Sequence, residues 1–214
     1  MSAAILGGGA DAWHPSPEQF FRDGAGPLLD MGPYYLTAIV ALLGPVARVA
    51  GFASTPTRER SIRVGPRAGG SFTATTPTHL TAAIELESGA TANLVASFEA
   101  VDHYVSDLEI YGRDRAIRLP DPNAFEGPLH LRRGRGDWVE VAYVSRGARE
   151  TRGLGLQELA EAVTEGREPR ASGRLGAHVV DVARSVLRAA AEGRTYEVGS
   201  SARRPEPLPV PRSG

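Results

Sequence analysis

The sequence predicts one α+β domain in which a large, mainly antiparallel sheet carries helices on one face. The middle of the chain contains closely spaced segments in which apolar and polar residues alternate, as in half-buried strands. Short turns separate these segments, and such short connections pair consecutive strands antiparallel. Segments with apolar residues at helical spacing lie before and after this region.

The alternation is clearest at Leu80–Glu87, after which Ser88-Gly89 predicts a hairpin into the next strand. A short strand is also expected at Ala3–Leu6, and Arg58–Thr76, rich in Arg, Gly, Ser and Thr, is expected to be a mobile loop. In chain order, the other expected strands are Val46–Ser54, Thr78–Glu87, Thr91–Glu99, Ser106–Tyr111, Ala116–Leu119, Leu129–Arg132 and Trp138–Tyr143.

Three helices are expected. The first, Pro27–Leu43, ends at Gly44-Pro45, and Pro33 should kink it or mark its true first turn. The second, Leu156–Thr164, places Leu156, Leu159, Ala160 and Val163 on one face, and the third is Ala177–Ala191. The domain is expected to span 1–199, and the proline-rich tail 200–214 to be disordered or draped over it.

Composition excludes several kinds of chemistry. The net charge of −1 gives no reason to expect a nucleic-acid or anionic-membrane partner. The chain has no Cys, and all its basic residues are Arg, so neither a thiolate nor a catalytic lysine can come from it. No apolar run approaches the roughly 18 residues of a membrane span, and no signal peptide is recognisable, so a cytoplasmic location is expected.

No Gly-x-Gly-x-x-Gly motif joins a strand to a helix. Gly7-Gly8-Gly9 is followed by Ala10, Asp11 and a proline-rich loop, so it cannot supply a helix N-terminus to a pyrophosphate. No βαβ alternation is present either, and we expect that this chain alone binds neither NAD nor NADP. No His, Asp and Glu residues have metal-ligand spacing, so no metal is expected.

The segment Gly24–Leu36, which contains Asp30-Met31-Gly32-Pro33-Tyr34, resembles the glycine-rich Asp-x-Gly-x-His helix of the glucose–fructose oxidoreductase / inositol dehydrogenase (Gfo/Idh/MocA) family. Other segments resemble this family in the same order along nearly the whole chain. They are the loop Trp13–Glu18 before that helix, the strand–turn–strand signature in Leu108–Gly112 and Leu119–Asn123, and the start of the last long helix at Gly173–Asp181.

The resemblance implies the second of the two family domains, an α+β domain with an open-faced sheet that follows a Rossmann domain. It implies the substrate-binding and assembly half of a nicotinamide-dependent sugar or polyol oxidoreductase, which transfers hydride from a secondary hydroxyl carbon to NAD or NADP. Met1 would fall inside an interior strand of that domain, so a truncated or excised product is expected. The alternatives are a non-catalytic sugar-binding or dimerisation module and a fragment without independent activity.

In the family, an Asp and a His four residues apart stand beside the reacting hydroxyl, which a Lys of the Rossmann domain contacts. The resemblance assigns these two positions to Asp30 and Tyr34, and residues at this spacing share a helical face. A phenol, with a pKa near 10, is a poor base. Either the Lys acts as base and Tyr34 orients the substrate, or the chain is not catalytic. Asp30 could instead cap a helix or stabilise a turn.

Four further residues are candidates for binding the substrate. Trp13 offers a ring face to a sugar, although it could instead fill the core under its loop. His14 offers hydrogen bonds to hydroxyls, and His103 could line the site. His178 is a candidate too, with a semi-buried structural histidine as the alternative.

The sequence also predicts a homodimer. In Thr91–Phe98 one face is apolar, and the other carries small, uncharged residues that suit a protein partner better than water. The resemblance implies pairing through this open face of the sheet. The alternative is that the tail from Ser200 covers it.

Overall fold

The computed structural model describes residues 1–125, 127–142 and 153–208. Its main sheet has nine strands in the order β10-β9-β8-β7-β1-β6-β5-β2-β11. Neighbouring strands are antiparallel except for β1 and β6, which run parallel. The strands are β1 Ser2–Leu6, β2 Val46–Ser54, β5 His79–Leu86, β6 Thr91–Ser97, β7 Leu108–Tyr111, β8 Arg115–Leu119, β9 His130–Arg133, β10 Val139–Glu140 and β11 Tyr196–Glu197. Tyr143, in the last expected strand, lies outside the described residues.

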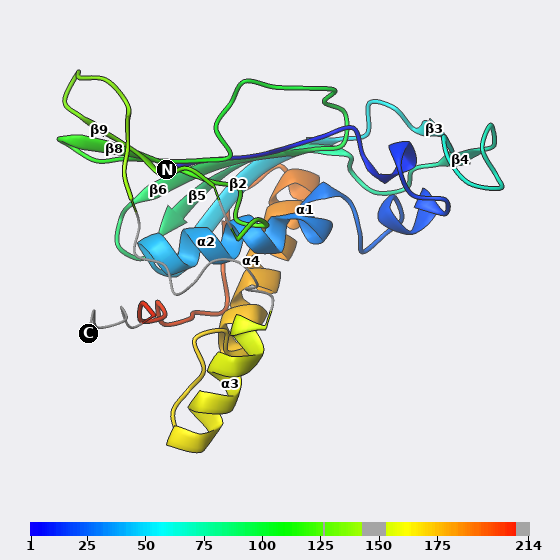
Figure 1. The fold of residues 1–214 in the computed structure, drawn as a ribbon. Helices are drawn as coiled ribbons and strands as arrows, with labels where there is room; N and C mark the ends of the chain where they lie inside the picture. Colours follow the sequence, from blue (N-terminus) through cyan, green and yellow to red (C-terminus); the bar gives the residue numbers. More distant parts are fainter. Residues whose placement is uncertain (126, 143–152, 209–214) are drawn as a thin grey trace.

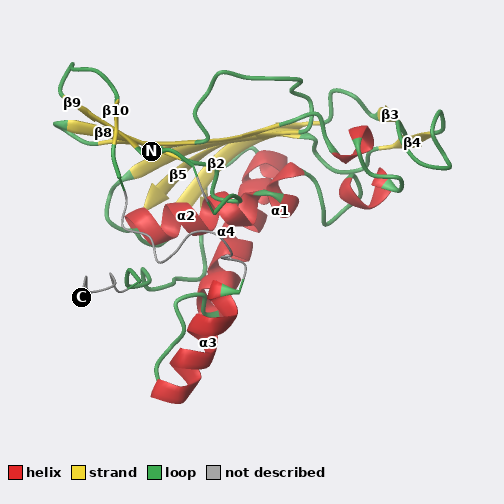
Figure 2. Cartoon of the chain, viewed as in Figure 1, coloured by secondary structure: helices red, strands yellow, loops and turns green. Residues whose placement is uncertain are grey.

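All the labelled helices lie on one side of this sheet, and its other face carries no helix among the described residues (Figures 1 and 2). The predicted fold class is therefore confirmed. The helices are α1 Pro27–Asp30, α2 Gly32–Leu43, α3 Leu154–Glu165 and α4 Gly173–Glu192. None of these described helices is long and apolar enough to cross a membrane.

The core lies between the sheet and helices α2 and α4. On β5 and β6 the alternation predicted from the sequence is observed, with Leu80, Ile84 and Leu94 buried and the residues between them facing away from the core. Leu36 of α2 and Val182 of α4 pack against this layer. The burial of these side chains is the main favourable contribution to folding, at about 25 cal/mol per Å² of apolar surface.

The expected helix Pro27–Leu43 forms in two parts that meet at Met31. Pro33 occupies the first turn of α2, where its missing N–H would have no helical partner. Gly44 ends α2 with φ of 98°, a conformation that glycine adopts without steric strain. The sequence prediction that Pro33 marks a first helical turn and that the helix ends at Gly44 is therefore confirmed.

Arg58–Thr76 is not merely a loop, because it contains the hairpin of β3 Glu59–Ser61 and β4 Ser71–Thr73. The reason is Arg60, which is only 6% exposed and forms ion pairs of 2.9 Å with Asp11 and 3.0 Å with Glu99. Its guanidinium also donates to the carbonyl oxygen of Gly8 at 3.1 Å. Arg60 thus fixes the β3–β4 hairpin to the loop after β1, although the polar composition of Arg58–Thr76 suggests a solvated segment.

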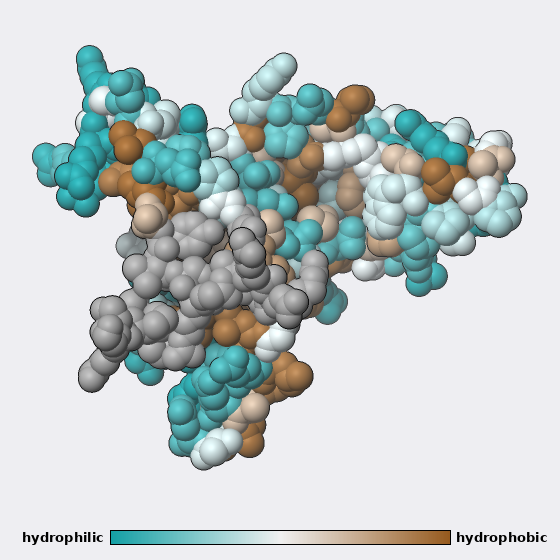
Figure 3. Space-filling model, viewed as in Figure 1, coloured by the Kyte–Doolittle hydropathy of each residue, from teal (hydrophilic) through white to brown (hydrophobic). Residues whose placement is uncertain are grey.

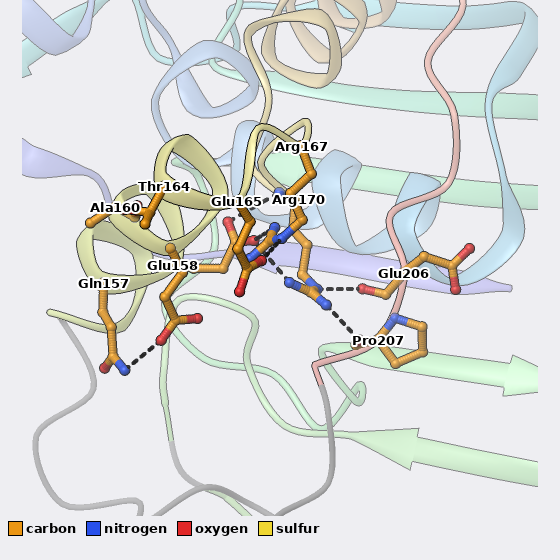
Figure 4. Close-up of polar contacts among 10 residues, drawn as sticks. Gln157, Glu158, Ala160, Thr164, Glu165, Arg167, Arg170, Glu206 and Pro207 are labelled. Atoms are coloured by element: carbon orange, nitrogen blue, oxygen red, sulfur yellow. Dashed lines mark hydrogen bonds and ion pairs between the residues drawn. The ribbon is translucent and has the colours of Figure 1, made fainter.

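Helix α3 has the opposite orientation to the one its sequence suggests. Its apolar residues Leu156, Leu159 and Val163 face solvent, and Figure 3 shows hydrophobic surface along one side of this projecting helix. Glu158, only 6% exposed, lies on the inner side. Its carboxylate accepts hydrogen bonds from the side chains of Arg167 at 2.5 Å and Arg170 at 2.9 Å, as Figure 4 shows.

The described part of the tail, residues 200–208, lies on the helix side of the domain. Ala202 is buried in the core, and Arg204 Nε donates to the carbonyl oxygen of Ala41 in α2 at 2.8 Å. Ser200 bonds to Asp181 of α4. This part is therefore draped over helices and does not cover the open face of the sheet.

We predict that Arg60→Met lowers the free energy of unfolding by about 3–5 kcal/mol, because it leaves two carboxylates buried without their partner. Urea denaturation measures this change. Arg63→Met, an exposed position of the same hairpin, is the control and should change the free energy by less than about 0.5 kcal/mol. Equal effects of the two substitutions would contradict the role given to Arg60.

Candidate functional site

A cavity of about 360 Å³ opens at the edge of the sheet where β1 and β6 both end. Since these strands are parallel, the loop after β1 and the end of β6 meet at this edge. The α1–α2 junction forms the wall opposite them. The lining residues with polar or aromatic groups are Trp13, Asp30, Tyr35, Ser97, Phe98, Asp107 and Asp121.

Three carboxyl groups face this cavity. Burial raises the pKa of Asp30. The pKa of Asp107 is raised mainly by burial and to a smaller extent by the nearby negative charge of Asp121. Asp121 Oδ1 accepts a hydrogen bond from the hydroxyl of Tyr35 at 3.2 Å. Burial, above all, raises the pKa of Tyr35 beyond its ordinary value, so this phenol keeps its proton and acts as a donor. Together these groups can accept hydrogen bonds from several hydroxyls of one ligand.

Asp30 has no capping role in the structure. The residue before α2 is Met31, and no side chain caps the start of that helix. Its carboxyl group is instead partly withdrawn from water at the cavity wall. The geometry thus favours the functional interpretation of Asp30 over the capping one.

Trp13 lines the same cavity and is 62% exposed. Its ring lies beside the partly buried rings of His14 and Phe20, at centroid distances of 5.4 and 5.7 Å. Its backbone N–H donates to the carbonyl oxygen of Ala10, which holds it in a tight turn after β1. An indole so exposed does not fill the core, so the geometry disfavours that alternative.

His14 supports the loop rather than the cavity wall. Its Nδ1 accepts the N–H of Ser16 at 3.0 Å, and its Nε2 lies 3.5 Å from the amide nitrogen of Gln19. Its ring packs edge-on against Phe20 with centroids 5.1 Å apart. These contacts orient its neighbour Trp13, and His14 is not among the residues that line the cavity.

Tyr34 is 45% exposed and does not line the cavity, whereas its neighbour Tyr35 does. The spacing argument assumed one continuous helix through Asp30 and Tyr34. Helix α1 ends at Asp30 and α2 begins at Gly32, so the two residues belong to different helices. Tyr34 therefore lies outside the wall that holds Asp30.

The two remaining histidines do not line the cavity. His103 lies in the loop before β7, where Nδ1 is 3.1 Å from the carbonyl oxygen of Val105. His178 is fully buried, its Nε2 accepts the N–H of Val46 at 3.0 Å, and its Nδ1 lies 3.0 Å from Ser200 Oγ. Burial lowers the pKa of His178. This arrangement favours the structural alternative for His178.

The sequence assignments missed Tyr35, Asp107 and Asp121. Asp121 lies in the Leu119–Asn123 segment that supports the family resemblance, but nothing in that segment alone indicates what its carboxylate faces. Asp107 directly precedes β7, and Asp121 follows β8 by two residues. They meet because Leu108 and Leu119 pair across these two strands.

Of the three glycines after β1, Gly9 is the one that close packing requires. Gly9 has φ of 84°, and a Cβ there would lie 2.8 Å from Asp11 Oδ1 and 2.9 Å from a Phe21 ring carbon. The chain then enters a 3₁₀ turn at Ala10–Ala12. Among the described elements, no strand–glycine loop–helix–strand unit forms, and no group of three His, Asp or Glu residues suits a metal.

Comparisons with known proteins agree with this architecture. Residues 5–118 match the model of the GFO/IDH/MocA C-terminal domain. No curated protein sequence matches the chain. Solved structures share its fold at low identity. An NAD-binding oxidoreductase from Klebsiella pneumoniae is 15% identical, with a TM-score of 0.73 over 94% of this chain and 58% of that one.

Two further solved structures with this fold are of enzymes whose names refer to sugars. Levoglucosan dehydrogenase is 18% identical, with a TM-score of 0.71 over 94% of this chain and 60% of its own. Aldose-aldose oxidoreductase from Caulobacter crescentus, complexed with glycerol, is 23% identical, with a TM-score of 0.66 over 92% and 53%. The chain thus spans somewhat more than half the length of these oxidoreductases. Since the family model matches more than half of the chain, the chain belongs to the GFO/IDH/MocA family through its C-terminal domain.

Proposed function

We propose that this chain is the substrate-binding half of a nicotinamide-dependent oxidoreductase that acts on a secondary hydroxyl of a sugar or polyol. The exposed Trp13 ring beside an acidic cavity is the observation that carries this proposal. The names of the similar structures support the substrate class. They include levoglucosan dehydrogenase in complexes with NADH and L-sorbose and with NADH and levoglucosan.

In this proposal the ring carbons of the sugar pack on the indole of Trp13, and its hydroxyls donate to the carboxylates of the cavity. Asp30 holds or receives the proton of the reacting hydroxyl, because burial makes its carboxylate a stronger base than a solvated one. Tyr34, exposed outside this cavity, is available to hydrogen-bond to a partner surface. A dinucleotide-binding unit would hold the nicotinamide, which would supply the acceptor for the hydride.

A second candidate is a sugar-binding module that performs no chemistry. The phenol of Tyr34 at the position of the family's histidine favours it, since a phenol is a weak base at neutral pH. Both candidates include sugar binding by this chain. Only the first also includes NADH formation when sugar, NAD⁺ and a dinucleotide-binding unit are combined.

The open face of the sheet supports the proposal of a homodimer. Phe52 is 80% exposed on β2, and it pairs with Thr81 on β5, which pairs with Val95 on β6. Phe52, Thr81 and Val95 thus form an uncharged outward row across three strands, which suits burial against a second copy.

Sugar binding should be visible in the fluorescence of Trp13. The chain has two tryptophans, so Trp138→Phe leaves Trp13 as the only one. In that background we expect levoglucosan or L-sorbose to change the emission with saturation. Adding Asp30→Asn should weaken binding about tenfold or more, because a charged acceptor is lost. Asp114→Asn, in the exposed β7–β8 turn, is the control and should bind normally. Failure to saturate at tens of millimolar sugar would contradict the proposal.

Asp30 should reduce stability at neutral pH. Its folded-state pKa is raised, so folding favours the protonated carboxyl, and that stability is lost as pH rises through the folded pKa. Asp30→Asn should therefore unfold at a higher temperature than the natural chain at pH 7, and at a similar temperature at pH 3. Thermal unfolding at both pH values measures this. A destabilised variant at pH 7 would support a structural role instead.

We predict a dimer in light scattering at tens of micromolar, and a monomer for Phe52→Asp at the same concentration. In a twofold dimer the substitution buries two added carboxylates, which disfavours association. Leu156→Asp, on exposed α3 at the helix side, is the matched control and should remain dimeric. A monomeric natural chain, or a dimeric Phe52→Asp variant, is the result that disproves this interface.

A further inference from the structure

A second cavity, of about 200 Å³, lies on the helix side of the domain, where the turn between α3 and α4 meets the C-terminal segment. It is smaller than the pockets of about 300–1,000 Å³ that enclose drug-sized ligands. The charged side chains that line it are those of Arg167, Arg170, Arg174, Arg203, Arg204, Glu168 and Glu206. Five cations and two anions give these lining side chains a net charge of +3.

Two of the arginines build the walls. Arg167 and Arg170 both bind the buried carboxylate of Glu158, as Figure 4 shows. The same guanidinium of Arg170 donates to the carbonyl oxygens of Glu206 at 2.9 Å and Pro207 at 3.2 Å. Arg170 therefore joins α3 to the C-terminal segment and fixes the shape of the cavity.

The other three arginines keep donors free. Within the described part of the chain, the Arg203 side chain has no ion pair or hydrogen bond. Arg204 uses only Nε, which donates to the Ala41 carbonyl oxygen, and Arg174 lies 3.7 Å from Glu168 with most of its side chain exposed. The start of α4 is already capped by Ser172 Oγ, so the arginines rather than the helix end supply the positive charge.

We propose that this cavity binds a phosphate group, as free phosphate or as part of a small phosphate ester. Guanidinium groups match phosphate oxygens in paired hydrogen bonds, and several of them around one cavity neutralise a dianion. Glu168 and Glu206, which also line the cavity, disfavour large polyanions. A bound phosphate would connect the C-terminal segment to the turn before α4, and it would stabilise the folded chain by mass action.

Isothermal titration at constant ionic strength, with inorganic phosphate, glucose 6-phosphate and glucose, tests this proposal. We expect saturable phosphate binding that Arg203→Gln weakens about tenfold. Arg113→Gln, an exposed arginine of the β7–β8 turn, is the matched control and should bind normally. Equal affinities for the two phosphates indicate free phosphate as the ligand, and tighter glucose 6-phosphate binding indicates an ester.

The proposal is separable from sugar oxidation. Asp30→Asn should leave phosphate binding unchanged, because Asp30 lines the cavity beside Trp13 and not the arginine-lined cavity. If glucose 6-phosphate binding is lost in Asp30→Asn but retained in Arg203→Gln, the compound binds at Trp13 and the phosphate site is refuted. Absence of saturable binding at about 20 mM phosphate, or equal weakening in Arg113→Gln and Arg203→Gln, overturns it as well.

Discussion

The parallel pairing of β1 with β6 determines where the candidate site lies. Five residue pairs, from Ser2 with Asn93 to Leu6 with Ser97, insert the first strand into the middle of the sheet. Because both strands end at one edge, the loop that carries Trp13 meets the end of β6 and the α1–α2 junction there. The antiparallel neighbours β7 and β8 then bring Asp107 and Asp121 to the same edge.

Two buried charge clusters hold the segments that the sheet does not. Arg60 ties the loop after β1 to the β3–β4 hairpin and to Glu99, and Glu158 ties α3 to the following turn. In each cluster an ion that would be costly to bury alone has partners of opposite charge. The consequence at α3 is an exposed apolar side at Leu156 and Val163, since its polar side faces inward.

The sequence predicted those elements whose local pattern and tertiary environment agree. Leu80 and Ile84 alternate with exposed residues on β5, and Pro33 marks the first turn of α2. The prediction from the sequence failed where contacts outside the local pattern determine which way a side chain faces. Periodicity identifies the apolar side of α3, but not that Arg167 and Arg170 draw Glu158 inward. Likewise, the spacing of Asp30 and Tyr34 does not show that a helix boundary separates them and that Tyr35 faces Asp121.

A crystal structure of this chain with levoglucosan or L-sorbose tests the central claim most directly. The account predicts a sugar ring against the indole of Trp13, with a hydroxyl oxygen about 3 Å from a carboxylate oxygen of Asp30. A sugar bound at another surface of the domain, or one that contacts neither Trp13 nor Asp30, would contradict it.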